Sequence, residues 1–129
     1  MANYSLLITS APYQGQHAQR AIEFAKSAIS SGHVVDNVFF YSEGVHHANS
    51  YMQEVGDEFY PLNAWKALNE EYNVSLLVCI TAALKRGVVG HQEALANDLS
   101  GVNLVPPFEQ AGLGEFFTAL HHCEKVIQF

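Results

Sequence analysis

The most apolar strand-like segment of the chain reads Val74-Ser75-Leu76-Leu77-Val78-Cys79-Ile80. A short apolar run of this kind, bounded by turns and helical patterns, is typical of a strand that is buried on both faces of a parallel sheet. We therefore predict a strand here and take it as the candidate for the centre of the sheet. Cys79 would then be the next-to-last residue of the central strand, at its carboxyl end.

Strand and helix patterns alternate along the rest of the chain. Strands are expected at Tyr4–Thr9, Asp36–Tyr41 and Lys125–Phe129, and at most a short one within Val102–Gln110. Helical spacing is found over Gln16–Ser31, from Pro61 to Tyr72, over Thr81–Gly87, over Gln92–Leu99 and from Leu113 to Leu120. Such alternation implies βαβ crossovers. The expected fold class is therefore α/β, a three-layer α/β/α arrangement with a mainly parallel sheet of about five strands.

A long polar stretch, Ser42 to Glu58, separates the second expected strand from the helix at Pro61. It contains two glycines and the pair His46-His47, and we interpret it as a loop with one helical turn at most. Loops of this length in compact domains are often functional. Its Val45, Tyr51 and Met52, with Phe59 just after it, are mostly of types enriched at interfaces, so we expect this loop to contact other subunits. The alternative is that these side chains fold back onto the domain itself.

Composition narrows the class of protein. The chain has 129 residues, of which 49% are hydrophobic, and this suits one domain spanning 1–129. Its net charge of −7 disfavours direct binding of nucleic acid, because phosphate contacts need clustered cations and Lys85-Arg86 is the only adjacent basic pair. No apolar run is long enough to cross a membrane and no secretion signal is evident. We expect a cytoplasmic protein with two reduced cysteines.

Cys79 is the first candidate for chemistry. Sites in open parallel sheets form at the carboxyl ends of the strands, in the crevice where the strand order reverses. The helix expected after Cys79 would point its free N–H groups toward the sulfur, which favours the ionised thiol. The alternative is a small buried hydrophobic residue. Cys123 follows His121-His122, which could help to activate a thiol, although a packing role is the simpler interpretation.

Other kinds of site lack support in the residues. Adjacent histidines do not form the paired spacing of zinc ligands, and neither C-x-x-C nor H-x-x-x-H occurs. The turn Ser10–Gly15 after the first strand has neither the G-x-G-x-x-G nor the P-loop pattern. We therefore expect no metal and no cofactor.

Several motifs resemble those of the TusD/DsrE family of sulfur-relay proteins. They are Val38-Phe39-Phe40-Tyr41-Ser42-Glu43-Gly44-Val45 followed by Ala48-Asn49, Asp57-Glu58-Phe59, Cys79-Ile80-Thr81-Ala82-Ala83-Leu84-Lys85-Arg86-Gly87-Val88-Val89, Gly112-Leu113-Gly114 and Val126-Ile127-Gln128-Phe129. The resemblance extends over nearly the whole chain. One departure is Ala111, where relatives often place a serine, and it lies outside the cysteine motif.

The resemblance implies a DsrE-like parallel α/β/α fold and a sulfurtransferase that carries sulfur as a persulfide on Cys79. It also implies TusB-like and TusC-like subunits in a heterohexamer, a TusA-like sulfur donor and a TusE-like acceptor, with 2-thiouridine in tRNA as the end of the route. Family members also tend to carry a second cysteine near the C-terminus, which would match Cys123.

Three alternatives stay open from the sequence. The chain could serve sulfur oxidation as a DsrE-type subunit, or act as a non-catalytic scaffold in which Cys79 only packs the core. It could also be a flavodoxin-like binder of small molecules.

Overall fold

A computed structural model describes residues 1–129. The strands are β1 (Asn3–Ile8), β2 (Val34–Phe40), β3 (Ser75–Cys79), β4 (Phe108–Ala111) and β5 (Lys125–Gln128). The helices are α1 (His17–Ser30), the 3₁₀ helix η1 (Ser42–Ala48), α2 (Pro61–Tyr72), α3 (Ile80–Lys85), α4 (His91–Ala96) and α5 (Leu113–Leu120). Every strand and α-helix expected from the sequence is present.

The five strands form one sheet in the order β4-β3-β2-β1-β5, and all neighbouring pairs are parallel. The predicted α/β class is therefore confirmed. The choice of central strand is wrong, because β2 lies in the middle and β3 lies second from the edge. Both strands are apolar, and only pairing between distant segments decides which one is central; Phe39 and Phe40 of β2 are fully buried, whereas Leu77 of β3 is not.

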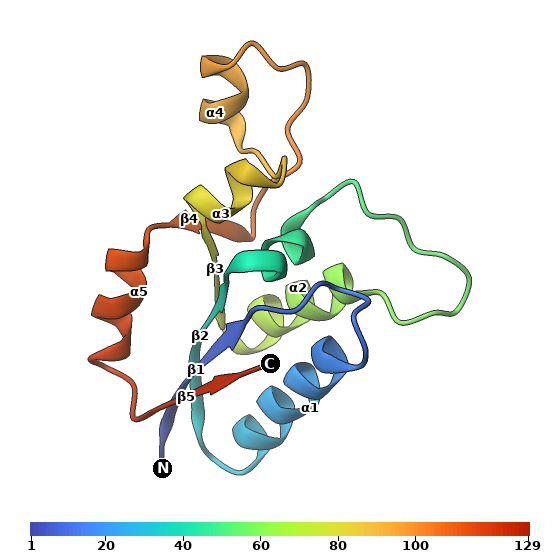
Figure 1. Ribbon diagram of the computed structural model, residues 1–129. Coiled ribbons are helices and arrows are strands. Elements are labelled where there is room, and N and C mark those ends of the chain that lie inside the picture. Colours follow the sequence, from blue (N-terminus) through green and yellow to red (C-terminus); the bar gives the residue numbers. More distant parts are fainter.

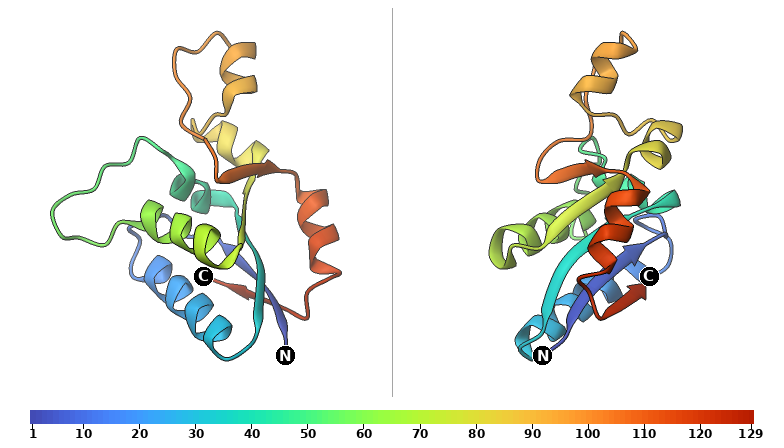
Figure 2. Two further views of the ribbon diagram at one scale, coloured as in Figure 1. Left: turned by 180° about the vertical axis from the view of Figure 1, so that it is seen from behind. Right: turned by 90° about the vertical axis from the view of Figure 1, so that its left-hand side faces the viewer.

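Helices cover both faces of the sheet (Figures 1 and 2). Helices α1 and α2 lie on one face and α5 lies on the other. Successive side chains of a strand point to opposite faces. Phe40 accordingly meets Trp65 of α2 in a T-shaped pair with ring centroids 5.1 Å apart, and its neighbour Phe39 stacks on Phe116 of α5 at 4.2 Å. These aromatic pairs hold the three layers together.

The segment after β2 is more ordered than the sequence suggested. It begins with η1, a helix of seven residues that contains buried Gly44, Val45, His47 and Ala48. A Cβ atom at Gly44 would lie 1.9 Å from the carbonyl oxygen of Ile8, so only glycine fits against β1 there. Of the residues expected to contact other subunits, Val45 is fully buried and Met52 and Phe59 pack against the core, which leaves Tyr51 exposed.

Helices α3 and α4 follow the carboxyl end of β3, and α4 projects away from the sheet (Figure 1). Gly87, which follows α3, has a φ of +75°, as a glycine after a helix often does. No helix is both long and apolar enough to cross a membrane.

Candidate functional site

Cys79 is the last residue of β3 and the N-cap residue of α3, one place closer to the strand end than the sequence suggested. Its partner in the neighbouring strand is Ala111, the last residue of β4. The side chain is only 3% exposed, yet it lines a pocket of about 430 Å³. The sulfur therefore lies within the pocket wall instead of on the open surface.

Three strand ends build this pocket. Tyr41 and Ser42 follow β2, Cys79 ends β3, and Gly112 and Leu113 follow β4. The pocket thus lies at the carboxyl edge of the sheet, as expected. It does not lie where the strand order reverses, because that occurs at β1, whose neighbours are β2 and β5. Residues of α3 and Leu113 at the start of α5 complete its lining.

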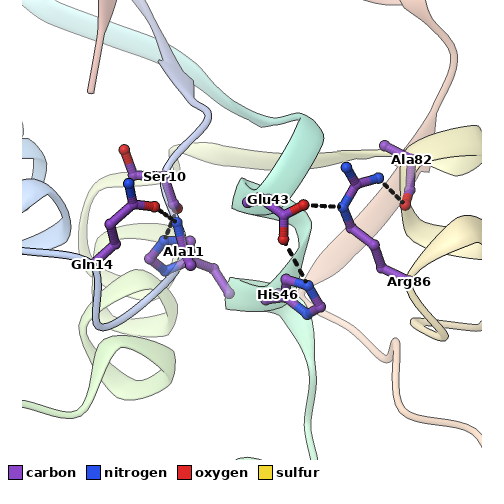
Figure 3. Close-up of polar contacts among 8 residues, drawn as sticks. Ser10, Ala11, Gln14, Glu43, His46, Ala82 and Arg86 are labelled. Atoms are coloured by element: carbon purple, nitrogen blue, oxygen red, sulfur yellow. Dashed lines mark hydrogen bonds and ion pairs between the residues drawn. The ribbon is translucent and has the colours of Figure 1, made fainter.

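Two cations line the pocket beside the cysteine, Lys85 and Arg86 of the segment that ends α3. Figure 3 shows how Arg86 is held: its Nε donates to Glu43 at 3.0 Å, and its Nη1 donates to the carbonyl oxygen of Ala82 at 3.1 Å. Glu43 also pairs with His46 Nε2 at 3.2 Å. Arg86 therefore ties η1 to α3 across the pocket rim.

The two histidines of the pair His46-His47 have different roles. His47 is fully buried; its Nε2 lies 3.0 Å from the carbonyl oxygen of Ser10, and its Nδ1 accepts the indole N–H of Trp65 at 3.0 Å. Since a carbonyl only accepts, the Nε2 atom carries the proton and the ring is neutral. Burial lowers the pKa of His47 to about 4, and His46 adds to this effect while the Ser10 hydrogen bond opposes it. His47 therefore links η1 to the segment after β1 and to α2.

Cys123 lies far from Cys79. It precedes β5, whose Lys125 pairs with Tyr4 near the start of β1, so it is near the amino edge of the sheet. The six residues of β1 separate the two edges by roughly 20 Å. Partial burial, with a smaller contribution from Asp36, raises the pKa of the Cys123 thiol. The structure therefore does not bring the two cysteines together, and Cys123 has little thiolate at neutral pH.

Sequence reasoning placed Cys79 at a strand end but did not single out most of the residues that line the pocket with it. Ser42, two residues after the end of β2, has a left-handed backbone with φ of 54°, and Gly112 is the N-cap residue of α5. The available signal was position, since each of these residues lies within two positions of the end of a strand. No group of three or more His, Cys, Asp or Glu side chains is placed to hold a metal ion.

The fold and site define a small α/β protein whose reactive candidate is one cysteine thiol in a pocket at the carboxyl edge of a parallel sheet. The chain matches the DsrE/DsrF-like family over residues 2–129. It is 43% identical over 129 residues to sulfurtransferase TusD of Pectobacterium carotovorum subsp. carotovorum, with both chains fully covered. It is 41% identical over 126 residues to sulfurtransferase TusD of Cronobacter sakazakii, covering 98% of each chain.

A solved structure agrees with the fold. The crystal structure of the ychN protein from E. coli superposes with a TM-score of 0.78 at 19% identity, covering all of both chains. The chain belongs to the DsrE/DsrF-like family and is a sulfurtransferase.

Proposed function

We propose that the protein carries sulfur as a persulfide on Cys79 and passes it between partner proteins. The observation that supports this most is the position of Cys79, at a strand end, inside a pocket and beside cationic side chains. A thiolate is the nucleophile in sulfur exchange, and nearby cations stabilise it. The same charges stabilise the persulfide anion that forms.

The proposed reaction has two balanced steps. In the first, the Cys79 thiolate attacks the outer sulfur of a donor persulfide, a new sulfur–sulfur bond forms, and the donor leaves as its thiolate. In the second, an acceptor thiolate attacks the outer sulfur of the Cys79 persulfide, and Cys79 leaves as the thiolate. No net oxidation occurs, so the cycle needs neither an electron carrier nor a cofactor.

The partners follow from the same proposal. A TusA-like protein would donate sulfur and a TusE-like protein would accept it, within a cytoplasmic heterohexamer that also holds TusB-like and TusC-like subunits, for 2-thiouridine synthesis in tRNA. The relatives named sulfurtransferase TusD support this assignment. Exposed Tyr51 and Val55, 58% and 62% accessible, lie on the segment after η1 and offer apolar surface to such subunits.

The test of the carrier is mass spectrometry on protein purified without reductant. We expect an addition of about 32 Da on the Cys79 peptide, which is one sulfur atom. A Cys79→Ser variant should lose this mass and all transfer but keep its fold, because the swap is nearly isosteric. A Cys123→Ser variant is the matched control and should keep both. Transfer by the Cys79→Ser variant would remove this residue from the mechanism.

The test of the route is genetic. Deletion of the gene should remove 2-thiouridine from cellular tRNA, and the wild-type gene should restore it whereas the Cys79→Ser gene should not. Unchanged 2-thiouridine on deletion would refute the tRNA route and favour a role in sulfur oxidation.

A further inference from the structure

The Cys79 pocket holds an unusual share of the chain's positive charge. The sequence has six Lys and Arg residues against 13 Asp and Glu, and two of the six, Lys85 and Arg86, line this one pocket. No carboxylate is among the lining residues. A protein with a net charge of −7 repels small anions in general. The two cations make the electrostatic potential in this pocket more favourable to an anion than on the rest of the surface.

The two cations differ in what they are free to do. Arg86 is partly neutralised by Glu43 and is fixed by its bond to the Ala82 carbonyl (Figure 3). Lys85 is exposed and makes no salt bridge, so its charge is available to a ligand. The hydroxyl groups of Tyr41, Ser42 and Thr81, on the same pocket wall, can donate hydrogen bonds to an anion.

We propose that this pocket admits a small anionic sulfane-sulfur compound, with thiosulfate as the probe, and that Cys79 can be loaded from it directly without a donor protein. The proposal rests on the proposed persulfide chemistry of Cys79 and names a further class of substrate for the same site. The volume of about 430 Å³ is within the range of small-molecule sites and is much larger than the sulfur itself requires.

The proposed step balances. The Cys79 thiolate attacks the outer, sulfane sulfur of thiosulfate, and a bond forms between the two sulfur atoms. The bond between the sulfane sulfur and the sulfonate sulfur breaks, and sulfite leaves with its electron pair. A thiolate and a dianion thus become a persulfide anion and a sulfite dianion. Lys85 is a positioning residue in this step, because its charge offsets the repulsion between the two anions as they meet.

The pocket's preference for anions can be measured apart from sulfur chemistry. Iodoacetate and iodoacetamide alkylate the same thiolate, but only the first is an anion, so the ratio of their rates at Cys79 reports the local charge. Lys85→Gln should lower the rate with iodoacetate roughly three- to tenfold more than the rate with iodoacetamide, because loss of the charge reduces the thiolate available to both reagents but the attraction only of the anionic one. Lys85→Arg should retain the wild-type ratio. Lys26→Gln, on the exposed face of α1, is the control for net charge.

The loading reaction is the second test. Reduced protein with thiosulfate should gain about 32 Da on the Cys79 peptide and release one sulfite per sulfur bound, more slowly in Lys85→Gln than in Lys26→Gln. Equal rates of loading in these two variants would overturn the proposal. So would a ratio of the iodoacetate rate to the iodoacetamide rate that is the same in Lys85→Gln as in the wild type. If protein from cells carries a Cys79 persulfide that thiosulfate cannot restore after reduction, this inference fails and the proposed function stands. If Cys79 never carries sulfur from any source, both fail.

Discussion

Lowering the pH should destabilise the protein through His47. The folded protein holds this ring neutral, with a pKa of about 4 against 6.5 for an ordinary histidine. Between about pH 4 and pH 6.5, His47 therefore binds a proton in the unfolded chain but stays largely unprotonated in the folded chain. Stability from His47 is fully present above pH 6.5 and is lost as the pH falls toward 4.

The magnitude follows from the difference between the two pKa values. The two pKa values differ by about 2.5, and each pKa unit corresponds to about 1.36 kcal/mol, so protonation effects at His47 lower the free energy of unfolding by roughly 3 kcal/mol in total. Roughly 2 kcal/mol of this decrease falls between pH 7 and pH 5. The structural cause is that both ring nitrogens are already used. Protonation at Nδ1 would place a donor against the indole N–H of Trp65.

Urea unfolding followed by circular dichroism at several pH values measures this effect. A His47→Gln variant can still accept from Trp65 and donate to Ser10 but cannot titrate, so its free energy of unfolding should fall by about 2 kcal/mol less than the wild type between pH 7 and pH 5. His121→Gln, at an exposed position after α5, should behave like the wild type. If the wild-type and His47→Gln curves ran parallel, the buried neutral ring would not be the cause of the acid sensitivity.

Three further outcomes are expected. Gly44→Ala should lower the free energy of unfolding in urea by about 3 kcal/mol or more, because the new Cβ meets the Ile8 backbone. Gly114→Ala on α5, where nothing lies within 4 Å of the new Cβ, should be neutral or slightly stabilising. Equal stability of the two variants would contradict the close packing of η1 on β1. Arg86→Gln should cost no more than about 1 kcal/mol, because its ion pair with Glu43 is partly exposed, and a larger loss in thermal unfolding would show a greater structural role. The chain alone should self-associate and, on co-expression with homologous subunits, elute with them as one complex; a stable monomer by light scattering that binds none of them would refute the assembly.

The sequence was sufficient for features that depend on local pattern. Apolar runs such as Tyr4–Thr9 and Val74–Ile80 predicted strands, because a strand buried on both faces must be apolar along its length. The helical spacing over Gln16–Ser31 predicted α1, and Gly32, which directly follows this range, has a positive φ of 88°, as a glycine after a helix often does. The place of Cys79 at a strand end followed from the same reasoning, and so did the carboxyl edge as the location of its pocket.

Tertiary structure alone decided what depends on contacts between distant segments. The sequence could not rank β2 and β3, because both are apolar and strand order is set by pairing. It could not separate His46 from His47, since burial of one ring depends on Trp65 and Ser10, which lie elsewhere in the chain. The cationic pocket likewise forms only when η1, α3 and α5 meet around Cys79, because the periodicity of each segment reports its own buried face and not its neighbours.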